Sequence, residues 1–567
     1  MKRSFFFFLF SFFFFKSSLS QDYLGFANSA FAGVNGIDVN PASIVNNPRR
    51  WDVTIIGINV AAGNNYIGMK KSALKKNGSL LKPDENTFPA FNDDDFQTNY
   101  LKERTNIKTA SVFAAVNISL PSFMFTRPKH KDAFAFTCKS RVYANVDGID
   151  PTLATMLYHN TGSPTADSLM YNQNFSALKV SLQTMVWNEY GITYGRTIQE
   201  TSNERLNVAA RAKLLHGLYA MYLFIDNVDY KFYKDDSLLI VSSLVHYGHS
   251  TNLEFNPSAI GFGFGGKPSV GLDLGATYEF YPLTDIRSKG KSSSKTTPLQ
   301  HEYKYKIGFS VQDLGWIKFL KPSNARDFKA DLMGDLDLNS LQGTGDSPLE
   351  GADDTLNVKY QMIPDDDKFR MNLPTVASLQ GDYYAGKNVY VNSTINYAFQ
   401  FKNNEDKIHE VTTFSLTPRW DWKWVGAYLP LSYNKFSKFR LGFTARIGPI
   451  ILGMADILPF ISKRDIYAAD FHFMLKVPHI SFKKKNKNPR SRSKFEVSKE
   501  KKTEKTKEKK RKSPKAEKRK KKEKGFKAAP QEKKTRKHIF PKVNIFKKKK
   551  KRNTELEQRD KIIYFKL

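Results

Sequence analysis

The sequence predicts an all-β protein: a transmembrane antiparallel β-barrel of about 14 (14–16) strands, with an N-terminal plug segment and a largely disordered basic C-terminal tail. Three features lead to this prediction. The chain opens with an export signal, long stretches alternate apolar and polar residues, and no later apolar run reaches the ~20 residues that a spanning helix needs. The expected boundaries are 1–20 for the signal peptide, 21–50 for the plug segment, 51–480 for the barrel and 481–567 for the tail.

The first twenty residues are ordered like a secretory signal peptide. Lys2 and Arg3 form a short positive region, residues 5–15 are apolar, and small residues at Ser18 and Ser20 precede the expected cleavage site. A membrane anchor is the alternative, but Lys16 ends the apolar run too early for a spanning helix. No cysteine directly follows the signal, which argues against a lipoprotein anchor. We therefore expect a cleaved signal and an exported mature chain.

Region 51–480 is rich in strict period-two alternation, which indicates strands with one apolar and one polar face. Clear examples are 268–281, 303–312, 388–401 and 411–424. Most of these runs have nine to thirteen residues. That is close to the ~9–11 residues of a tilted strand that crosses a bilayer, whereas soluble strands average about 5–6. A secreted β-sandwich or propeller would also alternate, but the long, aromatic-rich runs favour the barrel.

Fifteen candidate strands follow from this pattern. Because bacterial barrels usually have even strand numbers, one candidate is expected to be spurious or one strand to be missed. Residues 425–434 and 449–458 are apolar enough to supply a sixteenth. The candidates are 51–62, 108–120, 132–146, 178–186, 187–198, 204–215, 217–225, 237–248, 268–281, 302–313, 374–385, 388–401, 411–424, 438–448 and 466–477.

Charge is distributed unevenly along the chain. Residues 481–567 contain 38 Lys and Arg against 10 Asp and Glu, whereas residues 21–480 contain 48 against 45. The tail combines its charges with few apolar residues, so we expect it to remain unfolded. The single cysteine, Cys138, excludes an intramolecular disulfide framework and a zinc ribbon.

Basic residues dominate the strand faces that are expected to line the lumen. If the apolar faces meet lipid, charges must point inward, because a charge facing lipid costs about 2–4 kcal/mol at mid-bilayer. Only Asp273, Glu279, Asp421 and Asp470 oppose them. Two interpretations remain open: acidic loops that fold inward neutralise the excess, or the lumen prefers anions. The candidate lumen-facing basic residues are Lys139, Arg141, Arg205, Arg211, Lys213, Lys304, Lys306, Arg419, Lys423, Arg440 and Arg446.

No motif in the chain points to catalysis. The HExxH, GxSxG and P-loop patterns are absent, so we expect no enzyme, no catalytic residue and no cofactor. Acidic clusters occur in 63–107 and 316–372. They lack the twelve-residue spacing of a calcium loop with its Gly and terminal Glu, so no metal site is predicted.

The segment NSAFAGVNGIDVNPASIVNNPRRW (28–51) precedes the first expected strand and contains Asn40, Pro41 and Ala42. Together with GFGGKPSVGLDLGATYEFYP (263–282) and MNLPTVASLQGDYY (371–384), it resembles FadL-like long-chain fatty-acid transporters and the PorV and PorP/SprF barrels of the Bacteroidetes. The resemblance covers roughly residues 21–480. In FadL-like transporters this segment plugs the lumen, so the resemblance implies a plug at residues 28–50, with 40–42 as its motif.

Two classes of function follow. The first is an accessory or structural envelope component, associated with machinery such as type IX secretion, whose tail binds peptidoglycan or other envelope proteins electrostatically. The alternative is a FadL-like passive transporter or channel for small hydrophobic or anionic solutes. Both place the barrel in the lipid of the outer membrane and the tail in the periplasm. The export signal keeps the tail away from nucleic acid.

Overall fold

The computed structural model of the protein describes residues 23–74, 98–104, 106–159, 173–234, 237–251, 267–282, 303–323, 325–331, 335–337, 357–358, 361–363, 366–399, 408–434, 436, 438–462 and 464–478. The expected signal peptide (1–20) and basic tail (481–567) lie outside these residues.

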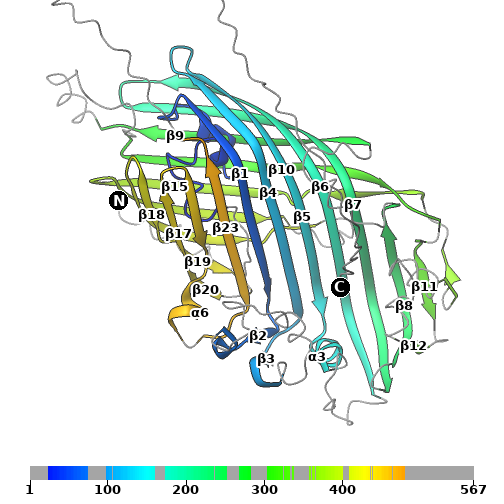
Figure 1. The fold of residues 1–567 in the computed structure, drawn as a ribbon. Helices are drawn as coiled ribbons and strands as arrows, with labels where there is room; N and C mark the ends of the chain where they lie inside the picture. The colour runs from blue at the N-terminus through cyan, green and yellow to red at the C-terminus, as the bar shows by residue number, and fades with distance from the viewer. Residues whose placement is uncertain are drawn as a thin grey trace, which may run out of the picture. The chain divides into compact units, whose positions relative to one another are not determined.

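The described wall strands form one closed antiparallel sheet (Figure 1). Its first five strands are continuous, and each pairs with the next. The sheet closes because the first strand also pairs with the last, β23 (Ala468–Lys476), for example Val60 with Phe471. The first five are β1 (Trp51–Asn64), β4 (Ala110–Arg127), β5 (Asp132–Ile149), β6 (Asn174–Glu200) and β7 (Glu204–Lys234).

Five of the remaining wall strands are interrupted. β8 (Ser237–His249) and β9 (Pro268–Phe280) both pair antiparallel with β7, so they are two parts of one strand. The other interrupted strands are β10 (Tyr305–Leu320) with β11 (Phe328–Asp331) and β12 (Asp335–Asp337), β13 (Gln361–Met362) with β14 (Lys368–Asn372) and β15 (Val376–Gly386), β18 (Val425–Tyr428) with β19 (Leu431–Asn434), and β20 (Lys438–Leu441) with β21 (Phe443–Ile447). Adding β16 (Val389–Ala398), β17 (Thr413–Asp421), β22 (Ile450–Met454) and β23 gives a barrel of fourteen strands.

The predicted barrel is confirmed, but several candidate strands were divided wrongly. Candidates 178–186 and 187–198 are one strand, β6. Its partner β7 carries a bulge opposite Val186 and Trp187, where the pairing passes from Tyr219 to Gly217 and skips Leu218. The bulge shifts the alternation of β7 by one residue, so the sequence reads as two strands there. Candidates 204–215 and 217–225 both belong to β7, and 237–248 and 268–281 share one wall strand. The two segments held in reserve, 425–434 and 449–458, do contain strands.

The wall has an apolar outer face and a polar inner face. Phe123, Ile192 and Phe309 point outward and keep 53%, 66% and 53% of their surface exposed, whereas Asn117 and Ser310 point inward and are buried. A closed, fully paired wall leaves no strand edge in lipid, where unpaired backbone groups have no partner. The fold is therefore that of an outer-membrane β-barrel.

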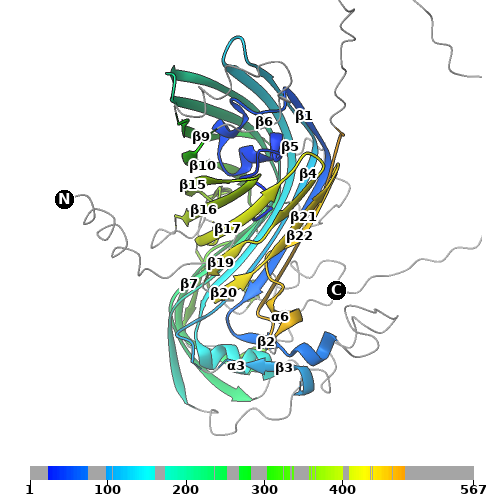
Figure 2. The same cartoon turned by 90° about the vertical axis from the view of Figure 1, so that its left-hand side faces the viewer.

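The two ends of the barrel differ. At one end most strands are joined by short turns, at 127–132, 200–204, 386–389, 421–425 and 447–450, while β9 and β10 are joined by the longer connection 280–305. The other end carries most of the long connections, with small elements (Figures 1 and 2), and two short ones, at 234–237 and 434–438. None of the helices among the described residues is long and apolar enough to cross a membrane. The small elements are β2 (Ile67–Met69), η3 (Lys71–Leu74), β3 (Leu101–Glu103), α3 (Pro151–His159) and α6 (Leu458–Ile461).

Residues 23–50, hereafter the N-terminal segment, lie inside the barrel toward the end with short turns (Figure 2). The segment contains two short 3₁₀ helices, η1 (Gly33–Asp38) and η2 (Pro41–Ile44). Its hydrogen bonds and ion pairs reach strands all round the wall, among them β4, β5, β9, β15, β16, β17 and β23. Hydrogen bonds on every side fix the segment in place without a sheet of its own.

A charge on the outer face tests the membrane depth of the wall. Phe309→Arg, on the outer face of β10, should reduce the free energy of unfolding from lipid vesicles by about 2–4 kcal/mol, because the charge faces hydrocarbon. Trp424→Arg is the matched control: Trp424 is equally exposed, at 56%, but lies in the turn after β17, where the cost should be about 0–1 kcal/mol. Equal losses in urea titrations would show that β10 does not cross the membrane at this depth.

Candidate functional site

The interior of the barrel is arranged in three layers along its axis. On β7, Asn207 is followed by Arg211 and Lys213 and then by Leu215 and Ala220, all buried. β5 and β10 show the same order, from residues that contact the N-terminal segment, through charged residues, to apolar ones. Polar anchoring, buried charge and an apolar interior therefore follow one another from the short-turn end toward the long-loop end.

Asn40, in the predicted plug motif, is the best-anchored side chain of the N-terminal segment. Its Nδ2 donates to Gln380 Oε1 at 2.9 Å, to the Ala276 carbonyl at 3.0 Å and to the Phe309 carbonyl at 3.2 Å. Its Oδ1 accepts from the Ala42 N–H at 2.9 Å and caps η2, whose first residue is proline. One side chain thus joins η2 to β9, β10 and β15.

Glycines in the wall make room for this anchor. A Cβ at Gly275 would overlap Asn40 and come within 2.8 Å of Pro41, and a Cβ at Gly308 would overlap Gln380. Both glycines belong to strands that face the motif, β9 and β10. The close approach of Asn40 to the wall therefore requires glycine at these positions.

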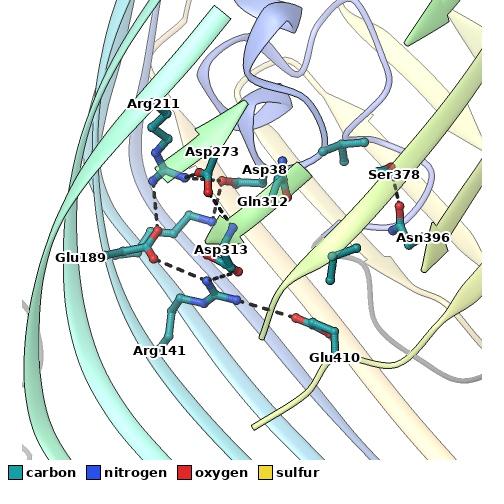
Figure 3. Close-up of a pocket in the computed structure, with 13 residues that line it drawn as sticks. Asp38, Arg141, Glu189, Arg211, Asp273, Gln312, Asp313, Ser378, Asn396 and Glu410 are labelled. Atoms are coloured by element: carbon teal, nitrogen blue, oxygen red, sulfur yellow. Dashed lines mark hydrogen bonds and ion pairs between the residues drawn. The ribbon is translucent and has the colours of Figure 1, made fainter. Parts of the chain in front are cut away.

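The middle layer, hereafter the ionic layer, consists of buried charges that pair in a network (Figure 3). Glu189 contacts Arg211 at 3.0 Å and Arg141 at 3.4 Å, and Asp273 contacts Lys213 at 2.6 Å and Arg211 at 3.2 Å. Four cations face five carboxylates, so the network is close to neutral, as buried charge requires. The members are Asp38, Lys139, Arg141, Glu189, Arg211, Lys213, Asp273, Asp313 and Glu410.

A bulge in β10 places one of these carboxylates, that of Asp313, in the ionic layer. Asp313 has φ +57, in the left-handed region that non-glycine residues rarely adopt, and the register with β9 shifts between Val311 and Leu314. The bulge turns the Asp313 side chain inward, where it contacts Arg141 at 2.8 Å and also Lys213, while its N–H donates to Asp273 at 2.7 Å. The ion pairs compensate for the backbone strain.

A second ionic cluster lies on the opposite wall. Arg419 forms a two-pronged contact with Asp382 at 2.6 and 2.7 Å, and its Nε donates to Asp421 at 3.0 Å. Ser29 of the N-terminal segment donates to the same Asp421 at 2.9 Å. The Nη1, Nη2 and Nε atoms of Arg419 all contact carboxylate oxygens. This guanidinium therefore holds the wall and the segment together and is not available to a solute.

A third cluster fixes the end of the segment against β1 and β23. Asp52 accepts from Lys476 at 2.6 Å, from Arg49 at 3.1 Å and from the Val34 N–H at 3.0 Å. Burial lowers the pKa of the Arg49 guanidinium from its ordinary value, and the adjacent Asp52 carboxylate opposes this shift. Arg446 stacks on Phe31 with its Cζ 3.9 Å from the ring centre.

The structure buries seven of the eleven predicted lumen-facing basic residues and leaves four more accessible. Lys139, Arg141, Arg211 and Lys213 meet in the ionic layer, Arg419 and Arg446 in the second and third clusters, and Arg440 is buried near Asp456 and Asp470. Among the accessible four, Arg205 pairs with Glu200, Lys304 donates to the Tyr384 carbonyl at 3.1 Å, Lys306 lies over Tyr303, and Lys423 is exposed in a turn.

Sequence reasoning missed most of the acids that balance these bases. Asp38 lies in the N-terminal segment, Asp313 on the bulge and Glu410 in a connection, all outside regular alternation. Glu189 lies in β6 close to the register shift with β7 at Val186 and Trp187, and Asp382 lies in β15. The described interior therefore has no marked excess of positive charge.

Beyond the ionic layer the interior is filled by apolar side chains, hereafter the apolar cluster. They come from many strands, with at most three from any one, which is why no apolar stretch in the sequence marks them. Arg141 joins the two layers, since its Cζ lies 4.9 Å from the ring centres of both Tyr143 and Trp187. The members are Phe113, Ala115, Tyr143, Met185, Trp187, Leu215, Ala220, Tyr222, Ile317, Phe319, Phe369, Met371, Leu373, Ile408, Val411, Phe436 and Ala468.

Little free space remains between the layers. The cavity at the ionic layer measures about 50 Å³ and is lined by its charged side chains with Val39, Gln312, Val376, Ser378 and Asn396 (Figure 3). Such a cavity holds a few water molecules and no larger solute. Among the described residues, no group of three or more His, Cys, Asp or Glu side chains is placed to hold a metal ion.

Removing one buried carboxylate tests the ionic layer. Glu189→Gln should lower the free energy of unfolding by about 3–5 kcal/mol, because Arg141 and Arg211 would lose a buried partner. Glu200→Gln, at the solvent-exposed end of the same strand, is the control and should cost about 0–1 kcal/mol. Urea unfolding in detergent measures both free energies, and equal effects would mean that the layer is not a buried ion network.

A methyl group on the wall tests the Asn40 anchor. Gly275→Ala should displace Asn40, cost about 1–3 kcal/mol by overpacking and expose the N-terminal segment to thermolysin. Gly381→Ala is the control, because a Cβ at Gly381 meets nothing within 4 Å. Similar proteolysis of the two variants would argue against a tight fit at the motif.

One comparison with known proteins identifies a family, and that family has no known function. The model of the "Family of unknown function (DUF5723)" matches residues 41–456. No curated protein matches the chain.

Several solved structures are similar to the chain at low identity. A Pseudomonas aeruginosa FadL homologue is 10% identical, with a TM-score of 0.36 and coverage of 82% of this chain and 99% of that one. The Pseudomonas putida toluene transporter TodX is 8% identical, with a TM-score of 0.28 and coverage of 81% and 93%. A TodX deltaS2S3 mutant, a monoaromatic hydrocarbon channel, is 11% identical, with a TM-score of 0.38 and coverage of 82% and 95%.

These scores are low, so the fold described above rests on the strand pairing of this chain alone. The predicted resemblance to PorV and PorP/SprF barrels stays a prediction. The family model spans most of the chain, and the protein belongs to this family of unknown function, DUF5723.

Proposed function

We propose that the protein is a passive outer-membrane channel for small hydrophobic solutes. The observation that carries this proposal is the apolar cluster inside the barrel. The lumen of most outer-membrane barrels is polar, and a barrel that served only as an envelope scaffold would have no use for an apolar interior next to a layer of charge. Apolar surface of this kind favours the transfer of apolar solutes from water.

The charges in the interior favour a hydrophobic solute over an anionic one. An anion-preferring lumen needs cations whose field is not already neutralised. Lys139, Lys213 and Arg419 each have carboxylate partners within 3 Å. The basic side chains are therefore better explained as structural ion pairs than as a selectivity filter.

The N-terminal segment acts in this proposal as the plug. The cavity between the described part of this segment and the strands measures about 30 Å³. We place the short-turn end in the periplasm, because short turns are typical of that side in outer-membrane barrels. The N-terminal segment then closes the periplasmic half, and the apolar cluster faces the outside.

An accessory role is the second candidate, and the charge of the tail is the observation that favours it. Residues 481–567 carry 38 basic against 10 acidic side chains, and Lys476, at the end of β23, lies beside the start of β1 at the short-turn end. A tail that continues from there would bind peptidoglycan carboxylates or acidic envelope proteins, including partners in a secretion system.

Solute flux into proteoliposomes tests the channel. The wild-type protein should pass a small neutral aromatic compound faster than benzoate or chloride. Ala220→Phe, inside the apolar cluster, should reduce this flux at least fivefold, whereas Ala212→Phe, on the outer face of the same strand, should not. Preferred passage of chloride would favour an anion channel instead. No flux of any solute would favour the accessory role.

A further inference from the structure

A short segment between β16 and β17, residues 408–412, crosses the interior of the barrel. β16 and β17 are the ninth and tenth of the fourteen wall strands, and the contacts of the segment are with β5, the third strand. Strands seven positions apart in a ring of fourteen lie on opposite walls. Figure 3 shows Glu410 reaching from one wall to Arg141 on the other. We call residues 408–412 the crossing segment.

Side chains of β5 hold the crossing segment through a small set of polar contacts. Asn145 Nδ2 donates to the His409 carbonyl at 3.1 Å, and the His409 N–H donates to Asn145 Oδ1 at 3.1 Å. His409 Nε2 lies 2.7 Å from Asp147 Oδ2. Glu410 accepts from the Tyr143 hydroxyl and lies 3.7 Å from Arg141.

The crossing segment cannot be held as a wall strand is held. The backbone of β5 at Asn145 is already paired on both sides, with Phe113 of β4 and Gln183 of β6. The segment is therefore attached to β5 through side chains, without a ladder of backbone hydrogen bonds. Such an attachment breaks locally, while the wall keeps its pairing.

The other face of the crossing segment is apolar. Ile408 and Val411 are buried, at 0% and 1% exposure, and are members of the apolar cluster. If the segment left β5, these two side chains would leave with it and vacate a space lined by the remaining apolar side chains. An apolar space of this kind stays dry and accepts apolar ligands.

We propose that the crossing segment is the gate of the apolar cluster: bound to β5 it fills the space that a hydrophobic solute would occupy, and released from β5 it opens that space. The inference rests on the proposed channel function and adds how the channel is regulated. The solute it admits is uncharged and of the size of a single aromatic ring, since it replaces Ile408 and Val411.

Access to a buried thiol tests the gate independently of transport. The reporter is Ala220→Cys, in the apolar cluster at 0% exposure, in a Cys138→Ser background so that it carries the single thiol. Asn145→Ala with Asp147→Ala removes two anchors of the crossing segment. It should raise the rate of labelling by N-ethylmaleimide at least tenfold. Asn207→Ala, which alters a buried asparagine near the N-terminal segment, is the matched control and should leave the rate unchanged.

Flux measured on the same proteins separates this inference from the proposed function. Faster labelling together with faster aromatic flux supports the gate. An unchanged labelling rate, or faster labelling that the control variant shows equally, overturns it. Faster labelling without any flux in either protein supports the gate as a device that controls access and contradicts the channel. A folded barrel shows a heat-dependent shift of its mobility on a gel. If the double variant does not show this shift, the single variant His409→Ala, which leaves β5 unchanged, replaces it in the same comparison.

Discussion

The neutralisation of buried charge is the constraint on which the interior of this barrel depends. Fourteen strands enclose a wide space, and the chain fills its middle with arginines, lysines and carboxylates that are almost entirely buried. An unpaired charge there would be far more costly than the pairs observed. The partners come from the walls, from the bulge at Asp313 and from Asp38 of the N-terminal segment. The position of the segment and the local distortion of β10 therefore belong to one network.

The same network separates two environments. On one side of it, the N-terminal segment is held by hydrogen bonds centred on Asn40. On the other side, apolar side chains from many strands meet, and the crossing segment adds two more. Charges that are already paired with each other attract a passing ion only weakly. The apolar side offers favourable transfer to a hydrophobic solute, which is why the interior favours a hydrophobic channel over an anion pore.

The barrel itself could be predicted from the sequence, because alternation with period two directly reports two faces of a strand. The number of strands was harder to predict. A single bulge at Leu218 of β7 and the break between β8 and β9 change the apparent number of strands without changing the wall. The basic residues of the interior could be named from the pattern. Their partners could not, since Asp38, Asp313 and Glu410 are brought in by irregular backbone.

The apolar cluster was also beyond prediction. It contains at most a few residues from each strand, spread from Phe113 to Ala468, so it exists only once the barrel has closed. The resemblance of the Asn-Pro-Ala segment to the FadL-like plug pointed to the interior, and the structure supplies a physical role for Asn40 as the link between η2 and three strands.

The most direct test of a hydrophobic solute site in the barrel is a crystal structure of the full-length protein grown with bromobenzene. The anomalous signal of bromine should lie inside the barrel, beside Trp187 and Phe319 and in place of Ile408 and Val411. Bromine found only against the outer, lipid-facing side chains would contradict an interior site for hydrophobic solutes.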